Sequence, residues 1–321
     1  MKTMRAIVLD QPTTAEDIVF SKVAVPAVKS GWVLVKIKAF GLNHSEQILR
    51  EHEILRDYIK KTIIPGIECV GVIEDASDTD LNIGQKVVAL MGGMGRSFDG
   101  SYAEYALLPR HHVFPVNTEM SWIEMGAVPE TYYTAWGSLM QCLQLKCDDT
   151  LLIRGASCAL GFAAIQMAKA LGCKIIATTH RDKHLHLLQE GGADESVLDD
   201  GEIADKICGA TKALELIGSK TLFDTMRSVE PGGIICHTGV LGNVFAFQSF
   251  SPLNHIPNGV YLTGFHSNYP TDDDLRDIFS FIDKYNLKPL TGAVYRFDDI
   301  RQALIDLDGH KVQGKIVICM E

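Results

Sequence analysis

Residues 150–171 read TLLIRGASCALGFAAIQMAKAL. An apolar run of strand length comes first, a turn of small residues follows, and the remainder places apolar side chains at helical spacing. A strand that leads through a glycine-containing turn into a helix opens a βαβ unit, from which parallel sheets are built. The stretch therefore predicts an α/β domain with a mostly parallel, doubly wound sheet.

The turn within this stretch predicts a phosphate site. Backbone N–H groups of a glycine-rich turn, with the N-terminus of the following helix, attract the pyrophosphate of a dinucleotide. The spacing departs from Gly-x-Gly-x-x-Gly, because Ala156 and Cys158 stand where the first two glycines belong and only Gly161 matches. An ordinary tight connection is the alternative interpretation. The residues expected at the pyrophosphate are Gly155, Ala156, Ser157, Cys158, Ala159, Leu160 and Gly161.

The end of the next expected strand, residues 174–178, indicates which dinucleotide binds. Sites for NAD place an acidic residue there to bond the ribose 2′-hydroxyl, whereas a 2′-phosphate needs cationic or hydroxyl donors. Thr179, Arg181 and Lys183 suit a phosphate, although a shift of one residue would substitute Asp182. We therefore expect NADPH, with a solvated loop as the alternative. Three residues after a later strand are also expected to meet the cofactor at the switch point of the sheet: Gly239, Val240 and Leu241.

The rest of the chain divides into two kinds of pattern. Before about residue 125, short strands separated by Gly and Pro predict a barrel-like β domain, with one helix expected over 45–58. After residue 130 strands alternate with helices, and the later strands are expected at 213–217, 233–237 and 260–264. The last fifty residues predict helices at 273–284 and 298–307 and strands at 293–297 and 314–319. This terminal part could return to the first domain.

Composition excludes several classes of protein. The chain has 321 residues, 46% of them hydrophobic, which suggests about two globular domains. Thirty basic against forty acidic residues give 30 − 40 = −10, a charge that repels nucleic acid. Eight scattered cysteines without a Cys-x-x-Cys pair are expected to be buried, reduced thiols. Because no apolar run is long enough for a membrane span or a signal peptide, a cytoplasmic protein without membrane partners is expected.

Several short motifs, taken in this order, resemble those of the medium-chain dehydrogenase/reductase superfamily, in its zinc-independent quinone oxidoreductase-like branch. They are AFGLN at 39–43, IPGIECVG at 64–71, IGQKVV at 83–88, GSYAEY at 100–105, TYYTAWG at 131–137, the turn at 155–161 and GKIVI at 314–318. The resemblance covers nearly the whole chain. It implies a GroES-like domain formed by residues 1–130 and 272–321, a Rossmann domain over 131–271, and a homodimer formed through the Rossmann domains.

The resemblance also allows a test for zinc. Zinc-containing members bind the catalytic metal with residues at the places of Asn43, Ile67 and Glu130. Isoleucine cannot ligate, and one Asn with one Glu falls short of the three protein ligands that a catalytic zinc needs. Residues 91–110 contain no cysteine, so the structural zinc loop is missing as well. No metal is expected, although Glu68, Cys69 and His44 lie close by, and His111-His112 and His184-x-His186 are expected to be surface histidines.

A site without zinc favours particular substrates. A simple ketone develops a localised alkoxide that a metal or an acid normally stabilises. A quinone or an α,β-unsaturated carbonyl spreads the charge, so orientation and modest hydrogen bonding suffice. By position in the resemblance, Asn43 and Thr134 are expected to orient the substrate and the nicotinamide ribose. Tyr58 is a candidate proton donor, with a packing or surface role as the equal alternative.

The expected function is thus an NADPH-dependent, zinc-free reductase of small conjugated carbonyls or quinones. A zinc alcohol dehydrogenase is the first alternative, and metal analysis separates the two. A non-catalytic NADP(H)-binding protein that responds to redox state is the second, because no obvious acid/base pair stands in the sequence. Turnover of NADPH with a panel of quinones separates a binder from an enzyme.

Overall fold

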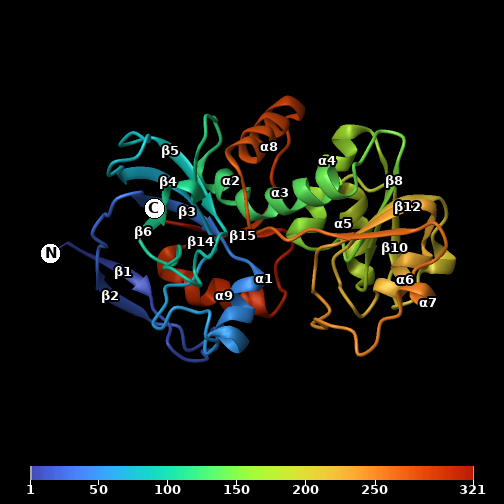
Figure 1. The fold of residues 1–321 in the computed structure, drawn as a ribbon, viewed down its shortest axis with the longest axis horizontal. Coiled ribbons are helices and arrows are strands. Elements are labelled where there is room, and N and C mark those ends of the chain that lie inside the picture. Colours follow the sequence, from blue (N-terminus) through green and yellow to red (C-terminus); the bar gives the residue numbers. More distant parts are fainter. Residues whose placement is uncertain (1, 321) are drawn as a thin grey trace. The chain divides into compact units, whose positions relative to one another are not determined.

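The computed structural model describes residues 2–320 and divides into two compact units (Figure 1). The second unit is continuous and comprises Thr134–Ser267. The first unit combines the segment that ends at Tyr133 with the segment that begins at Asn268, so both ends of the chain contribute to it.

A six-stranded parallel sheet forms the second unit, in the order β10-β9-β8-β11-β12-β13. Numbered along the unit this order is 3-2-1-4-5-6, that of the Rossmann fold, and the strand order reverses between β8 and β11. Helices connect the strands, as expected for parallel pairs. The strands are β8 (Thr150–Arg154), β9 (Lys174–Thr179), β10 (Glu195–Leu198), β11 (Ala210–Glu215), β12 (Val229–His237) and β13 (Tyr261–Gly264). The helices are α4 (Ala159–Leu171), α5 (Leu185–Glu190), α6 (Leu222–Arg227) and α7 (Pro252–His255).

The helix α4 follows directly from its sequence. Cys158 caps its first turn and Gly172, with a φ of 89°, ends it in the left-handed conformation that glycine adopts most readily. Phe162 and Ile165 are buried on its inner side, and Leu152 of β8 belongs to the core of the sheet. Hydrophobic burial on both faces of the sheet explains why the strands read as continuous apolar runs.

Strand β11 ends two residues earlier than the sequence pattern predicts. The expected strand ran to Ile217, but the regular structure stops at Glu215. The buried Glu215 carboxylate accepts the backbone N–H groups of Ile217 and Gly218, at 2.7 and 3.0 Å, and so forms the turn itself. A side chain that bonds the backbone just beyond it competes with continuation of the strand.

The first unit is built around a seven-stranded sheet in the order β14-β15-β3-β4-β5-β7, with β6 paired to β3 and a separate β1-β2 pair. The C-terminal strand β15 pairs antiparallel with β3, so that Val317 lies opposite Gly41. This pairing closes the unit from both chain ends. The strands are β1 (Thr3–Ile7), β2 (Phe20–Ala24), β3 (Trp32–Gly41), β4 (Glu68–Asp75), β5 (Lys86–Leu90), β6 (Tyr105–Pro109), β7 (Val113–Pro115), β14 (Thr291–Arg296) and β15 (Lys315–Cys319).

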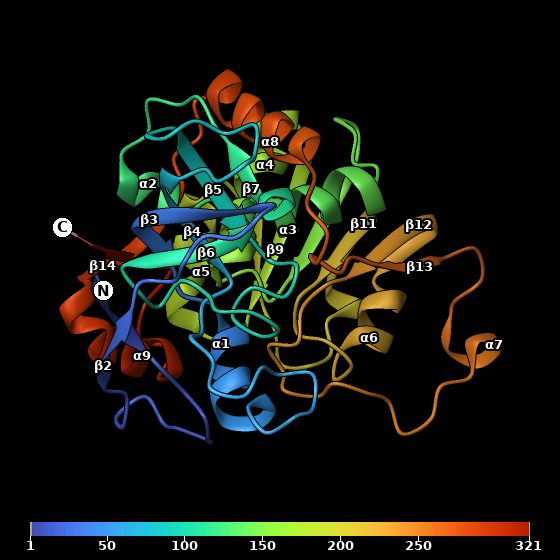
Figure 2. The ribbon, with the colours of Figure 1, turned by 60° about the vertical axis from the view of Figure 1, so that its left-hand side comes forward.

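The helices of this unit lie on its sheet or at its end. Helix α9 (Ile300–Asp308) contacts β14 and β15 (Figure 2), and α8 (Asp272–Tyr285) begins with a Thr271 cap and buries Leu275, Ile278 and Phe279. α2 (Trp122–Gly126) contacts β3, and α3 (Pro129–Trp136) runs across the boundary between the units. No helix in the described part of the chain has the length and apolar character needed to cross a membrane.

The helix expected over 45–58 is much shorter in the structure. α1 spans His44–Ile48 and continues as a wider, π-helical turn over Leu49–Glu53. The Arg50 side chain, which is fully buried, anchors this turn by donating to both carboxylate oxygens of Asp308, at 2.9 and 2.7 Å, and to the carbonyl of Thr13. This long-range ion pair has no signature in the local sequence, and Tyr58 lies beyond the helical part.

Two expectations about burial hold only in part, since His111 and His186 are exposed as expected. Of the eight cysteines, which are all free thiols, Cys69, Cys173 and Cys236 are buried, whereas Cys147 and Cys208 are exposed because they lie in connections between elements. Conversely, His112 and His184 are buried rather than at the surface. Burial lowers the pKa of both imidazoles, which favours their neutral forms.

Candidate functional site

Three turns meet at the carboxyl end of the parallel sheet, where its strand order reverses. The turn after β8 brings Gly155, which has a φ of 81°, next to Ile217 and Leu241. Leu241 donates its backbone N–H to the Leu216 carbonyl at 3.1 Å, which joins the turns after β11 and β12. Dinucleotides bind at this place in sheets of this topology. The expected residues from the turn at 155–161 and from 239–241 are thus brought together within the second unit.

The backbone of the turn over 155–161 requires glycine at both of its glycine positions, Gly155 and Gly161. Gly155 adopts a φ that side-chain-bearing residues disfavour, and it replaces Ala156 in the first glycine's role. At Gly161 a Cβ atom would lie 2.2 Å from the Ala156 carbonyl oxygen, so only glycine permits the close packing of helix on turn.

Cys158 stands at the second glycine position of the common motif and caps the helix that follows. Its φ of −109° is an ordinary extended value, and its Sγ accepts the Gly161 backbone N–H at 3.3 Å as the cap of α4. The Cys158 sulfur therefore accepts a hydrogen bond from one of the N–H groups in the first turn of the helix, which have no partner within the helix.

The residues expected at a 2′-phosphate lie together at the end of β9. Thr179 Oγ1 lies 3.1 Å from Ser157 Oγ of the glycine turn and accepts the backbone N–H of Arg181 at 3.3 Å. The strand ends at Thr179, so Asp182 stands three residues beyond it, in a short 3₁₀ turn, and is exposed. No carboxylate takes the strand-end position in this part of the described chain.

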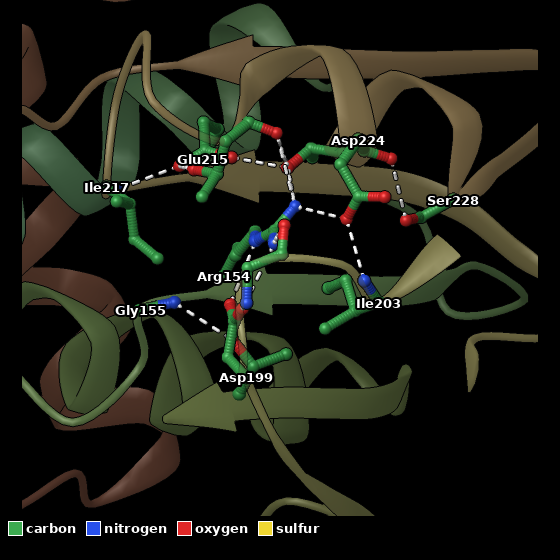
Figure 3. Close-up of polar contacts among 12 residues, drawn as sticks. Arg154, Gly155, Asp199, Ile203, Glu215, Ile217, Asp224 and Ser228 are labelled. Carbon is green, nitrogen blue, oxygen red and sulfur yellow. Dashed lines mark hydrogen bonds and ion pairs between the residues drawn. The ribbon is translucent and has the colours of Figure 1, made fainter. Parts of the chain in front are cut away.

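A buried ionic network at this end of the sheet has no signature in the local sequence motifs (Figure 3). Arg154, the last residue of β8, is fully buried and donates to both carboxylate oxygens of Asp199, to Asp224 at 2.7 Å, and to Thr225 Oγ1. Its Nη atoms also reach the carbonyls of Thr221 and Gly201. Burial alone would raise the pKa of Asp199, but the bonds from Arg154 lower it.

This network is connected to the turns at the carboxyl end of the parallel sheet. Thr178 Oγ1 accepts the Gly155 N–H at 3.1 Å and donates to Asp199, while Glu215 holds the turn at Ile217. Glu215 also accepts from the hydroxyl of Thr225, which Arg154 contacts, and burial raises the pKa of its carboxyl. The sequence did contain a signal, because each of these two strands ends with a charged residue directly after buried apolar residues.

In the first unit, hydrogen bonds to the carboxylate of Glu68, which follows Ile67 directly, join two of the three zinc-related places, Asn43 and Glu130. The buried Glu68 carboxylate accepts the Asn43 side-chain N–H at 2.9 Å and the Glu130 backbone N–H at 2.7 Å. The Lys315 ammonium lies 2.7 Å from the same carboxylate and 2.5 Å from the Asn43 amide oxygen. Gly41 makes room for this cation, since a Cβ there would lie 2.2 Å from Lys315 Cε.

Beside this cluster, which comprises Asn43, Glu68 and Lys315, lies a second buried carboxylate. Glu46 accepts the backbone N–H groups of Asn43 and Ile67, at 2.8 and 3.2 Å. Burial and the charge of Glu68 raise the pKa of its carboxyl to about 7. Burial also raises the pKa of the Cys69 thiol, so this cysteine is held as a neutral thiol and not as a metal-binding thiolate.

The donor set does not fit a zinc ion. Ile67 is buried and apolar, and the Asn43 amide oxygen and one Glu68 oxygen face an ammonium group that would repel a dication. Across residues 2–320 no group of three or more His, Cys, Asp or Glu side chains is arranged to hold a metal.

The other two expected catalytic residues have different surroundings. Tyr58 is 58% exposed, and burial of its phenol together with a bond to Glu53 raises its pKa, which makes it a weaker acid. Arg96 bonds the same Glu53 and also Ser45. Thr134 is 4% exposed and lies in α3, at the first position of the second unit.

Comparison with known proteins agrees with this fold. Residues 29–118 match the alcohol dehydrogenase GroES-like domain, and residues 159–284 match the zinc-binding dehydrogenase family. Quinone oxidoreductases of Mus musculus and Homo sapiens are each 25% identical, over 94% of this chain and 92% of theirs. A synaptic vesicle membrane protein VAT-1 homolog of Danio rerio is 28% identical over 92% of this chain and 66% of its own length.

Solved structures with the same fold span the whole chain. The quinone oxidoreductase of Coxiella burnetii has a TM-score of 0.84 at 19% identity and covers 100% of both chains. A mycobacterial protein complexed with NADPH has a TM-score of 0.85 at 22% identity, covering 98% of this chain and 99% of its own. From its two domains, its topology and these relatives, the chain belongs to the medium-chain dehydrogenase/reductase superfamily, in its quinone oxidoreductase-like branch.

Proposed function

We propose that this protein is an NADPH-dependent, zinc-free oxidoreductase that transfers hydride to a quinone or an α,β-unsaturated carbonyl. One observation carries the proposal: Lys315 bonds Asn43 and Glu68 at the place where zinc-containing relatives hold their metal. Two relatives named as quinone oxidoreductases, from mouse and human, support the acceptor class.

The cluster accounts for the choice of acceptor. A simple ketone needs a strong electrophile at its oxygen, and the Lys315 ammonium is engaged by Glu68 and Asn43. A conjugated acceptor spreads the incoming charge and depends mainly on orientation. The Asn43 amide nitrogen donates one of its two hydrogens to Glu68, which leaves the second to orient the acceptor oxygen.

The second unit has the features that a dinucleotide needs. When bound, the nicotinamide would supply a hydride from its C4 atom. The turn over 155–161 and the N-terminus of α4 would hold the pyrophosphate, because their N–H groups lie at the switch point of the sheet. Thr179, Arg181 and Lys183 would hold the 2′-phosphate, and a solved neighbour of the same fold is complexed with NADPH.

Protonation of the product does not require a dedicated acid in this proposal. Tyr58 has a raised pKa and a carboxylate partner, which favours its retaining its proton. Solvent can protonate a delocalised anion, so no single side chain is indispensable for this step. The homodimer expected from the resemblance stays a prediction that light scattering can check.

The test combines turnover with metal analysis. Purified protein is assayed for NADPH oxidation with a benzoquinone and an enone, before and after chelator treatment, and its zinc is measured. We expect activity that survives the chelator at a zinc content far below one ion per chain. Loss of activity on chelation, with stoichiometric zinc, would favour a zinc alcohol dehydrogenase. Binding of NADPH without oxidation of it by any acceptor would indicate the non-catalytic alternative.

A further inference from the structure

A cluster of basic side chains follows β9 directly. His180, Arg181, Lys183, His184 and His186 fall within seven residues, and His180, Lys183 and His186 are exposed. The pKa of the buried His184 is lowered by burial first and then by its basic neighbours, among them the cationic Arg181 and Lys183. The segment therefore concentrates positive charge at the end of this strand.

One contact within this cluster fixes a protonation state. The Arg181 Nε–H donates to His180 Nε2 at 3.2 Å. A ring nitrogen that accepts a hydrogen bond carries a lone pair, so this contact requires that Nε2 of His180 carry no proton. The Arg181 backbone is in turn tied to Thr179 Oγ1, which contacts Ser157 of the glycine turn. These bonds hold the His180–Arg181 pair beside that turn.

We propose that His180 takes up a proton when a 2′-phosphate binds and so determines part of the preference for NADPH. This inference rests on the proposed cofactor. The phosphate oxygens would draw the Arg181 guanidinium away from His180 Nε2, which then accepts a proton from solvent and donates a charge-assisted bond to the phosphate. The N–H bond at Nε2 is the new covalent bond.

Several charged and titratable groups surround His180 and bear on its proton uptake when the phosphate binds. Arg181 and Lys183 on its own segment carry positive charge, His184 and His186 are further basic groups there, and Asp182 carries negative charge. Asp199, which follows the neighbouring strand β10, donates its backbone N–H to the carbonyl of Thr179. Its carboxylate is bonded to Arg154 and is therefore engaged elsewhere. In the free protein His180 Nε2 accepts from Arg181, whereas a phosphate dianion would compete for that guanidinium and attract a proton to Nε2.

Calorimetry of the intact protein tests the inference. Binding heats of NADPH and NADH are measured near neutral pH in two phosphate-free buffers of different ionisation enthalpy, which gives the protons taken up. We expect uptake on the order of half a proton per bound NADPH and about none for NADH. The 2′-phosphate's own titration cannot mimic this, because a cationic site makes it release protons.

Two matched variants assign the proton. His180→Gln keeps a side chain that can accept from Arg181, but should abolish the uptake and weaken NADPH binding by about tenfold, with NADH unchanged. His186→Gln, an exposed histidine of the same segment, should leave both quantities as in the wild type. Selective NADPH binding without proton uptake, or uptake that persists in His180→Gln, overturns this inference alone. Equal affinity for the two cofactors overturns the proposed cofactor and this inference with it.

Discussion

The side chain of Asn43 is held by hydrogen bonds at both its oxygen and its nitrogen. Its amide oxygen accepts from Lys315 and its nitrogen donates to Glu68, so its orientation is fixed from two sides. Orientation fixed in this way is what positioning of a substrate requires, because small displacements raise the barrier steeply.

Replacing Asn43 and Tyr58 separately should therefore have unequal effects. We expect Asn43→Ala to lower kcat/KM for a benzoquinone by more than about tenfold, and Tyr58→Phe by about tenfold or less. Steady-state NADPH oxidation measures both, with circular dichroism as the control for folding. Complete loss of activity in Tyr58→Phe, with Asn43→Ala intact, would instead make the tyrosine an essential acid.

Glu46 should give stability a recognisable pH dependence. Its folded pKa is raised to about 7 from an ordinary value of 4.5, so the folded state keeps a proton that the unfolded chain loses. Its favourable contribution is therefore complete below about pH 4.5 and is lost as pH rises towards 7, by roughly 1.4 kcal/mol per unit.

The variant Glu46→Gln isolates this effect. It removes the titration but also one backbone acceptor, so its stability should be lower by about 1 kcal/mol in acid, with a flatter slope towards neutral pH. Urea unfolding at a series of pH values gives both quantities. If stability changes with pH equally in the wild type and the variant, folding does not raise the pKa of Glu46.

Cys158 is expected to contribute to the helix rather than to obstruct the cofactor. Cys158→Gly removes the Sγ acceptor for the Gly161 N–H, which should cost up to about 1 kcal/mol of stability. The freed N–H can serve the pyrophosphate, so NADPH affinity should stay unchanged or rise. Thermal unfolding and fluorescence titration measure the two; abolished binding would place the glycine turn in a different register.

At the scale of the elements, the strand ends of the parallel sheet are set by charges. Arg154 closes β8 and Glu215 closes β11, and both meet at Thr225 of α6. The same network reaches Asp199 after β10 and, through Thr178, the N–H of Gly155. Strand β9 and the connections after β8, β10 and β11 thus share one set of buried hydrogen bonds, which favours rigid turns at this end of the sheet.

Removing Arg154 should be among the most damaging single changes. Arg154→Met leaves the Asp199 and Asp224 carboxylates buried without their partner, which we expect to cost about 3–5 kcal/mol. Arg154→Lys keeps the charge but not the planar set of donors, so its stability should lie between those of the wild type and of Arg154→Met. Denaturant unfolding checks the order, with NADPH affinity as the readout of positioning. A Met variant as stable as wild type would contradict the role of the network.

At the scale of the whole molecule, two units with separate cores share one chain. A ligand held by the second unit stabilises the protein by an amount set by its affinity. NADPH should therefore raise the melting temperature more than NADH does at equal concentration. Arg181→Ala should remove most of that difference by weakening NADPH binding by about 1.5–3 kcal/mol. Thermal scans of both proteins with both cofactors check this, and equal effects on the two cofactors would argue against a phosphate role.

What the sequence could determine was local. The strand, turn and helix of residues 150–172 contain their own signals: the apolar spacing, Gly155, Gly161 and the final Gly172. The structure follows these signals closely. The same holds for the strand β9 and the hydroxyl and basic residues after it. Parallel strands joined by helices then leave few possible topologies, which is why the fold class was predictable.

What only the tertiary structure decided involves partners distant in the chain. Asn43 and Lys315 are 272 residues apart, and Arg154 finds Asp224 across 70 residues, so neither contact leaves a periodic trace in the sequence. The early end of β11, the short α1 and the burial of His112 and His184 are of the same kind. Hydrophobic periodicity reports which face of an element is buried, whereas the pairing of buried charges depends on which elements the fold brings together.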